Sequence, residues 1–318
     1  MATTQPVTNL GEIVDDVLVA TRPYVARLNR LGVQFRSNPE RPGKKVDVPV
    51  VQIGEATEFD RSTNNYGDSS GAISTVEVSL SSHPKTTLAV TPDAYDNLGE
   101  SGTLAVDAVA KEQAGIEVGT AALRAYHNLL PGASATTSPA MTLASHTSGA
   151  AMDKDDFAAI QANVLSGFAA AGGRPKYAGA EPANCSLVLS ATAYAAACKL
   201  YDASNYRGGD GPNPTRDGWF EGGLLGFRDV IADPMIPSTI VGYVVPRGSL
   251  ALAVRPVAVR NPEGYAGYAY REDDRSGLTL TIRTKIDSNV DDRITTVEAL
   301  FGGVLAFPAQ VLVVKPHA

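Results

Sequence analysis

The chain of 318 residues carries a net charge of −7 and is 44% hydrophobic and 19% charged, values typical of a folded globular protein with a core of its own. It has no run of about 18 apolar residues and no basic-then-apolar segment at its start, so the sequence argues against a membrane span or a secretory signal and predicts synthesis in the cytoplasm. The negative charge also argues against a protein that neutralises nucleic-acid phosphates over its whole surface.

Residues 1–45 are predicted to form an extended arm. Apolar residues have helical spacing in residues 10–18 and again in residues 25–31, and such short amphipathic pieces must lie on another surface. Residues 21–45 contain seven basic residues and one acidic residue, a net charge of +6 that leaves −13 on the rest of the chain. Because few aromatic residues are interleaved with the basic ones, we favour docking of this arm on an acidic neighbour of its own kind over contact with nucleic acid.

A long two-stranded hairpin is predicted next. Residues 46–51 and 75–80 have strand patterns, and the polar, turn-forming residues 60–71 lie between them. In the second strand Val76, Val78 and Leu80 alternate with polar residues, so one face is apolar. Because an isolated two-stranded hairpin is marginally stable in water, this one needs another surface to rest on.

A single long helix is predicted for residues 101–130, and the rest of the chain is expected to be organised around it. Val109, Ile116, Leu123 and Leu130 recur every seven residues among small residues, and a Pro-Gly pair at residues 131–132 ends the pattern. About 28 residues at a rise of 1.5 Å each give a rod of roughly 40 Å, which is the length of a strut. The alternative is a helix within a helical bundle, but the flanking sequence is rich in strands and offers no second helix of that length.

A linker rich in Ser, Thr and Ala (residues 132–151) is predicted to lead into a compact α/β region. Its first helix begins beside aspartates, where the helix dipole favours acids, and has an apolar face. The aspartates are Asp153, Asp155 and Asp156, and the face consists of Phe157, Ile160, Val164 and Phe168. A buried strand at residues 185–189 follows, and Ser190 caps an alanine-rich helix that runs to about residue 201. Cys185 and Cys198 are too few for a disulfide framework and wrongly spaced for zinc, so we expect both to be reduced and buried.

The last third is predicted to consist mostly of strands and loops. A glycine-rich loop covers residues 205–218, and a second loop, residues 261–277, carries Tyr265, Tyr268 and Tyr270 among charged residues. Strands are expected at residues 241–245, 249–259, 278–285 and 311–314.

No motif in the sequence predicts catalysis, so no catalytic, cofactor-binding or metal-binding residue is assigned and we expect a protein that is not an enzyme. Residues 67–71 match G-x-S-x-G, but they lie in the predicted hairpin tip instead of between a strand and a helix. The aspartates lack the spacing of a calcium loop, and the glycines of residues 208–211 lack the Lys-Ser/Thr of a P-loop. No histidine has a local setting that marks a base partner, and the four are His83, His127, His146 and His317.

The order of arm, hairpin, long helix, α/β head and closing strands resembles the major capsid proteins of tailed double-stranded DNA bacteriophages, which have the α+β Hong Kong 97-type fold. The most telling stretch is NCSLVLS at residues 184–190 with the helix after it, followed by GGLLGF at 222–227 and DPMIP at 233–237. These resemble the strand, the "L-x-G" turn and the "mP" turn of that family's head domain. GSL at 248–250 and EALFGG at 298–303 are similar to the strand after the head and to the end of the peripheral domain.

The resemblance implies a division of the chain into five segments. They are an N-terminal arm at residues 1–45, an extended hairpin loop at 46–90, a peripheral domain with the spine helix at 91–151, an axial domain at 152–259, and closing strands of the peripheral domain at 260–318.

The resemblance also implies a function: a coat protein that assembles as pentamers and hexamers into an icosahedral shell around a DNA genome. It would be assembled in the host cytoplasm and end in the virion capsid, with no cofactor and no membrane, contacting packaged DNA non-specifically at most. The arm begins close to Met1 without the long scaffolding segment of some relatives, so a separate scaffolding protein is expected, together with a portal and, as a further candidate, a decoration protein. Nothing marks Lys85 and Asn64 as a cross-linking pair. The alternative is an encapsulin-like cellular nanocompartment, a shell of the same fold around protein cargo.

Overall fold

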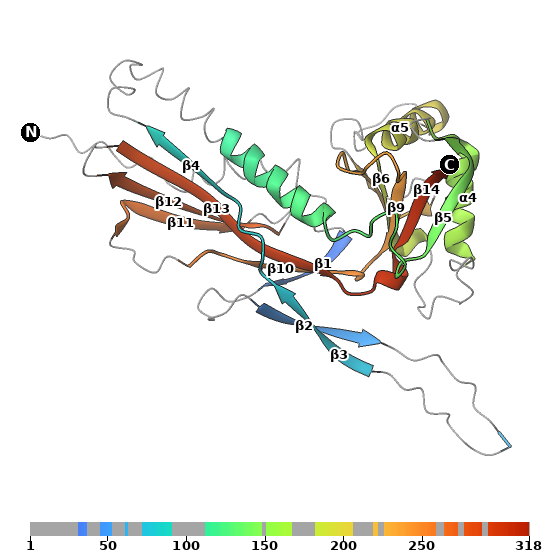
Figure 1. The fold of residues 1–318 in the computed structure, drawn as a ribbon, viewed down its shortest axis with the longest axis horizontal. Coiled ribbons are helices and arrows are strands. Elements are labelled where there is room, and N and C mark those ends of the chain that lie inside the picture. Colours follow the sequence, from blue (N-terminus) through green and yellow to red (C-terminus); the bar gives the residue numbers. More distant parts are fainter. Residues whose placement is uncertain are drawn as a thin grey trace, which may run out of the picture.

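The computed structural model describes residues 31–36, 45–52, 61–62, 72–90, 112–147, 151–166, 182–205, 219–221, 226–258, 264–272, 277–287 and 292–317. Within these residues the chain forms two six-stranded sheets and a separate two-stranded hairpin that projects away from them (Figure 1). We call the sheet on the left of Figure 1 the long sheet and the one on the right, which carries the C-terminus, the head sheet. Among the described residues, no helix is long and apolar enough to cross a membrane.

The long sheet is built around β13 (Asp292–Leu305), its longest strand. One edge of β13 pairs with β12 (Thr279–Asp287), which pairs with β11 (Gly267–Glu272). The other edge is shared: β10 (Leu250–Arg255) pairs with residues 300–305 and β4 (Lys85–Val90) with residues 293–298. Finally β1 (Gly32–Arg36) lies parallel to β10. The predicted strands at β10 and β12 are therefore confirmed.

Four strands of the long sheet, β1, β4, β11 and β13, are not among the strands assigned from the sequence. β1 follows directly after a segment read as helical, β4 was placed within the hairpin loop, and β11 was read as a loop because of its charged neighbours. β1 and β4 are held by the distant strands β10 and β13, and such ladders override local preference, whereas β11 pairs with β12, the next strand along the chain. Exposed and partly buried residues alternate along β11, but the large side chains are on the exposed face: Tyr268 and Tyr270 are exposed, and Ala269 is partly buried.

The central helix is observed over residues 112–127, and residues 101–111 lie outside the described residues. Its buried row repeats every four residues, through Ala114, Val118, Ala122 and Tyr126, all at most 5% exposed. The predicted seven-residue stripe is only partly right, because Leu123 and Leu130 are buried but Ile116 is half-buried. A seven-residue repeat drifts by about 20° per repeat around a straight helix, so small residues at spacing four make the contact here.

The helix also ends three residues earlier than predicted. Leu129 N–H donates to the Tyr126 carbonyl at 2.9 Å and Leu130 N–H to the His127 carbonyl at 3.0 Å. These i to i−3 bonds form tighter turns that finish the helix ahead of the Pro-Gly pair.

The head sheet has the strand order β5-β14-β9-β6-β8-β7. Its strands are β5 (Ala140–Thr147), β14 (Leu312–His317), β9 (Gly242–Pro246), β6 (Cys185–Leu189), β8 (Asp229–Ala232) and β7 (Trp219–Glu221). The prediction of a linker over residues 132–151 is wrong, because β5 is an eight-residue strand parallel to β14. The Ser and Thr residues of β5 obscure the strand pattern, in which Met141 is partly buried and Leu143 is buried. Its pairing partner lies at the far end of the chain, so the sequence around β5 does not indicate it.

The two helices of the head match their predictions. α4 (Lys154–Leu165) begins with a capping box between Asp153 and Asp156, and its inner residues Phe157, Ile160 and Val164 are fully buried. Before α5 (Ala191–Asn205), Ser190 Oγ accepts the Ala193 N–H at 3.4 Å, as expected of an N-cap. The predicted Phe168 and the glycine-rich loop fall on residues that lie outside the described ones.

The strand between them, β6, is buried along its whole length, as predicted. Cys185 and Cys198 are both buried and reduced, also as predicted. Burial raises the pKa of the Cys185 thiol to about 12, against the smaller opposing effect of the Arg228 charge, so this thiol stays protonated at neutral pH.

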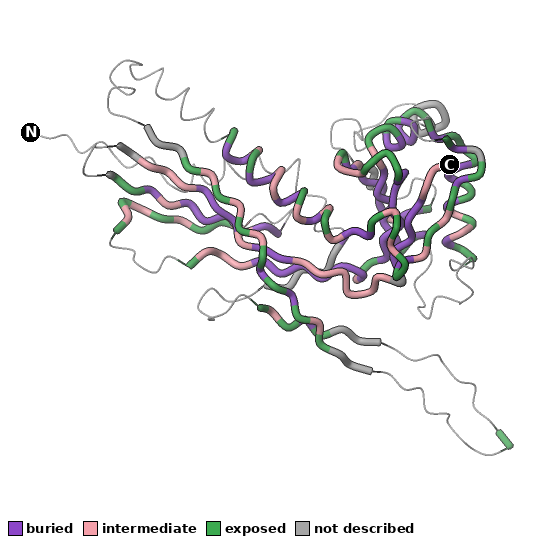
Figure 2. Tube along the Cα trace, viewed as in Figure 1, coloured by how far each residue is buried: buried purple, intermediate pink, exposed green. Residues whose placement is uncertain are grey.

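The hairpin pairs as predicted, through β2 (Lys45–Gln52) and β3 (Ala72–Ser79) in antiparallel register from Lys45↔Ser79 to Gln52↔Ala72. The surface that supports its base belongs to the same chain: Val48 and Val78 are buried in a cluster with Ala251 and Ala253 of β10. In Figure 2 the described residues at this base are a mixture of buried, intermediate and exposed positions. Among the described residues, the hairpin is thus anchored on the body of the subunit at its base.

Candidate functional site

Two of the sequence motifs that could suggest chemistry fall outside the described residues. They are the G-x-S-x-G match at residues 67–71 and the glycines of residues 208–211. Two of the aspartates have a structural role, since Asp153 Oδ1 accepts the Asp156 N–H at 2.9 Å and Asp156 Oδ2 accepts the Asp153 N–H at 3.1 Å. In the described ranges, no three His, Cys, Asp or Glu side chains are grouped as metal ligands would be.

Three histidines lie against carboxylates that their local sequence does not indicate. His83 Nε2 lies 2.8 Å from Glu298 Oε2, His127 Nδ1 lies 2.9 Å from Asp233 Oδ2, and His146 Nδ1 lies 3.4 Å from Asp156 Oδ2. In the first two pairs the partners are 215 and 106 residues apart in the chain. No local pattern could have revealed these pairs, because the folding of distant strands brings the partners together.

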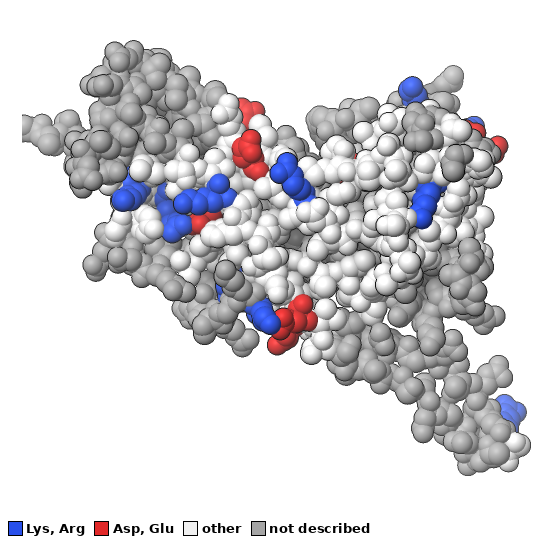
Figure 3. Space-filling view, in the orientation of Figure 1, with Lys and Arg blue, Asp and Glu red and all other residues white. Residues whose placement is uncertain are grey.

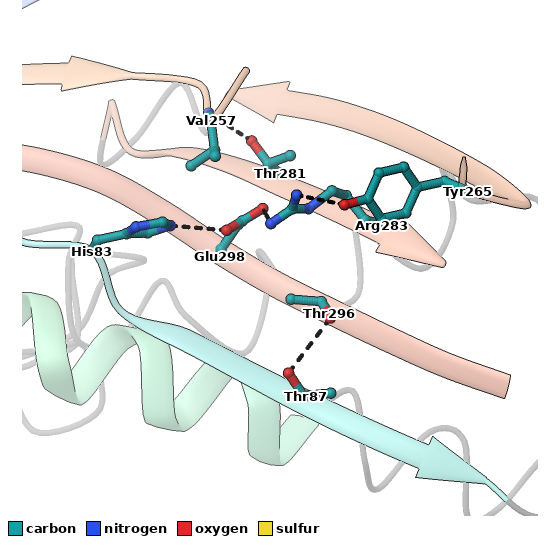
Figure 4. A network of polar contacts seen from close by, with 8 residues as sticks. All are labelled: His83, Thr87, Val257, Tyr265, Thr281, Arg283, Thr296 and Glu298. Carbon is teal, nitrogen blue, oxygen red and sulfur yellow. Dashed lines mark hydrogen bonds and ion pairs between the residues drawn. The ribbon is translucent and has the colours of Figure 1, made fainter. Parts of the chain in front are cut away.

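Glu298 is the centre of a polar network on the long sheet (Figure 4). Its carboxylate is fully buried on β13 and forms an ion pair with Arg283 of the neighbouring strand β12. His83, from the crossover between β3 and β4, contacts the other carboxylate oxygen. Arg283 also donates to the Tyr265 hydroxyl at 3.0 Å, and its guanidinium carbon lies 5.3 Å from the centre of the Tyr265 ring. The network therefore ties β12, β13 and the crossover together.

We expect replacement of Glu298 by glutamine to lower the free energy of unfolding by about 3 kcal/mol, because Arg283 loses the charge that compensates its partial burial. His83→Gln is the matched control: its side chain is 46% exposed, so the loss should stay below about 1 kcal/mol. Urea unfolding of the two variants measures both effects. Equal losses would mean that Arg283 does not depend on Glu298.

A second polar cluster lies where the central helix meets the head sheet. Asp233, which follows β8, is nearly buried, and its Oδ1 accepts the Met235 N–H at 2.8 Å while Oδ2 faces His127. A carboxylate can only accept, so His127 Nδ1 carries the hydrogen of that bond. From β9, the Tyr243 hydroxyl donates to the Pro131 carbonyl at 3.0 Å. We call Tyr126, His127, Asp233 and Tyr243 the joint cluster.

Tyr126 is the unusual member of the joint cluster. It is 3% exposed, and its hydroxyl has no hydrogen-bond partner within the described part of the chain. Burial, and then the nearby Asp233 charge, raises the pKa of Tyr126 well above its usual value. An unsatisfied buried hydroxyl costs about 1–3 kcal/mol, so the Tyr126 hydroxyl destabilises the folded arrangement observed.

Two features of the surface are suited to contact with other molecules. The first is the hairpin: its ladder ends at Gln52↔Ala72, and the 19 residues between these positions in the sequence include four acidic residues and Arg61. On the outer strand β11, Tyr268 and Tyr270 are 45% and 40% exposed and lie edge to face, with ring centroids 5.7 Å apart. An exposed edge strand with large side chains is a ready surface for association.

Charge is distributed unevenly over the face seen in Figure 3. Lys and Arg side chains gather over the region of β4, β12 and β13 with an acidic side chain among them, and further acidic side chains lie on the neighbouring central helix and over the base of the hairpin. Exposed members of these two groups are Lys85 and Lys285 on the strands and Glu112 and Glu117 on the helix. Such separated charges suit contact between copies of one chain, although the contribution of each exposed charge is small.

Comparison with known proteins gives likenesses of structure alone. No protein-family model matches the sequence, and neither does any curated protein. The capsid structure of the cyanophage P-SCSP1u is 10% identical, with a TM-score of 0.51 over 90% of this chain and 86% of that one. The virus-like particle of Pyrococcus furiosus is 12% identical, with a TM-score of 0.50 over 96% and 98%. The capsid of an empty GTA particle is 15% identical, with a TM-score of 0.51 over 92% and 90%.

These likenesses cover most of each chain, so this protein and the three similar ones do not differ by the insertion or loss of a whole domain. At 10–15% identity they establish the fold. The α+β capsid-type fold that the sequence resemblance implied is therefore confirmed.

Proposed function

We propose that this chain is the major capsid protein of a tailed double-stranded DNA bacteriophage, a shell subunit that self-associates and has no catalytic role. The observation that carries the proposal is the hairpin, which is anchored on β10 at its base and whose described strands project away from the two sheets (Figure 1). A segment of this kind contributes little to the folding of its own subunit, but it can reach a neighbour. The fold shared with capsid subunits supports the same conclusion.

The proposal includes several partners. In the shell, copies would form pentamers and hexamers, with the acidic hairpin tip and the basic arm contacting neighbouring copies. A separate scaffolding protein, a portal and a decoration protein are proposed as further partners, with packaged DNA contacted non-specifically at most. We also propose the five-segment division of arm, hairpin loop, spine-helix region, axial domain and closing strands, assembly in the host cytoplasm, and a final location in the virion capsid.

A cellular nanocompartment shell is the second candidate, and one observation favours keeping it. The likeness to the Pyrococcus furiosus virus-like particle spans nearly all of both chains. The two candidates share a subunit fold and differ in what the shell encloses.

The purified protein, expressed alone and together with a candidate scaffolding protein, tests the proposal by electron microscopy and sedimentation velocity. We expect closed icosahedral shells in at least one of these preparations. A monodisperse monomer at high concentration in both preparations would contradict a shell subunit. For shells recovered from their natural source, packaged DNA supports the virion and an enclosed enzyme supports the nanocompartment.

A further inference from the structure

Asp233 connects two bodies of the subunit through one carboxylate. The residue follows β8 of the head sheet, where its backbone N–H donates to the Leu189 carbonyl of β6 at 2.8 Å. Its Oδ1 is engaged locally by the Met235 N–H, whereas Oδ2 reaches out to His127 on the central helix. Oδ2 is therefore the acceptor through which the helix end is held to the head.

Tyr126 is a second donor beside the same carboxylate. It is buried next to His127, and the Asp233 charge lies close enough to act on it, yet its hydroxyl has no partner among the described residues. Native structures rarely keep a buried hydroxyl unsatisfied without a reason. Consecutive residues are about 100° apart around a helix, so a roll of the helix end of that order exchanges which of the two faces Asp233.

The helix end is incompletely packed on the side that faces the long sheet. A cavity of about 50 Å³ adjoins the helix end, lined by Ala125, Tyr126 and Leu129 of the helix and by Leu252 and Phe301 of the long sheet. Protein interiors are otherwise closely packed, and a void next to a packed element reduces the contacts that hold it in place. The helix also ends here in i to i−3 turns at Leu129 and Leu130, whose hydrogen-bond geometry is poorer than that of an α-helix.

We propose that the joint cluster is a two-position latch: Asp233 accepts from His127 in the position observed, and from Tyr126 in a second position that the helix end reaches by rolling into the adjoining cavity. The orphaned Tyr126 hydroxyl destabilises the first position, and the loss of the His127 contact destabilises the second. The two positions differ in how the central helix meets the head sheet, so the latch sets the relative orientation of the two bodies. This inference concerns the subunit itself and does not depend on the proposed function.

A four-variant cycle of the full chain tests the latch: unmutated protein, Tyr126→Phe, His127→Ala and the double variant, compared by their thermal unfolding midpoints. Alone, Tyr126→Phe should leave the midpoint unchanged or raise it, because the hydroxyl has no partner in the first position. In the His127→Ala background the same change should lower the midpoint by roughly 2–4 °C, because Tyr126 has taken over the carboxylate. Tyr243→Phe is the matched control, since its hydroxyl contacts Pro131 in either background and should have the same effect in both.

The same effect of Tyr126→Phe in both backgrounds would overturn the proposal. If His127→Ala does not fold, amide hydrogen exchange of the unmutated protein and of Tyr126→Phe decides instead. The turn at Asn128, Leu129 and Leu130 must open for the helix end to roll, so we expect these amides to exchange roughly 2- to 10-fold more slowly in Tyr126→Phe, where the second position has lost its hydrogen bond. Equal or faster exchange would exclude the latch.

Discussion

Replacement of Gly302 by alanine is expected to prevent most of the chain from reaching its native fold. Gly302 lies on β13 where the chain leaving β3 crosses over the long sheet, and an added Cβ would overlap the Ser79 carbonyl oxygen and lie 3.0 Å from the Leu80 Cα. Both contacts are with backbone, so no side chain can turn aside. We expect the free energy of unfolding to fall by more than about 3 kcal/mol, a large part of the stability of an ordinary domain. Urea unfolding and the soluble yield measure this loss.

The matched control is Gly132→Ala, where an added Cβ meets nothing within 4 Å. There we expect no loss, and a small gain through reduced freedom of the unfolded chain. The steric explanation would be wrong if the two variants were equally stable. The atoms that an added Cβ would meet belong to Ser79 and Leu80, where the chain leaves β3, and not to β10. The steric explanation therefore predicts that the passage of this segment over β13 makes the glycine necessary, and that the pairing of β13 with β10 does not.

The sequence was most informative where a residue's own neighbours decide its structure. The N-cap at Asp153, the buried run at Cys185–Leu189 and the alternating strand of the hairpin were predicted because capping, burial and period-two patterns are local. The central helix is of the same kind, although its buried face was misplaced: the small residues Ala114 and Ala122 decide how closely the helix approaches the sheet.

The sequence was least informative where structure depends on pairing across the chain. β5 is rich in Ser and Thr and was read as a linker, yet β14 at the other end of the chain makes it a strand. The contacts of Glu298 with His83 and Arg283, and of Asp233 with His127, could not be predicted for the same reason. Without a known ligand chemistry, no motif indicates which acid will meet which base. The fold resemblance supplied the order of elements but none of these contacts.

Deleting the hairpin tip is expected to abolish assembly while leaving the subunit folded. The ladder ends at Gln52↔Ala72, so residues 53–71 can be replaced by Asn-Gly, a dipeptide that favours a two-residue hairpin turn. Folding should survive, because the contacts that anchor the hairpin are at its base, where Val48 and Val78 pack on β10. The thermal unfolding midpoint of the isolated subunit should therefore not change.

Assembly should fail because the shortened hairpin cannot reach an adjacent subunit, and the variant should sediment as monomers or small oligomers under conditions in which the unmutated chain forms shells. Asp47→Asn, on the exposed face of the retained base, is the control and should assemble normally. Refilling the gap with 19 Gly and Ser residues separates two causes: recovery of assembly would mean that only length matters, and continued failure would mean that the acidic tip makes specific contacts. If the Asn-Gly variant itself forms complete shells of normal stability, the tip is a surface loop and the hairpin does not join neighbouring subunits.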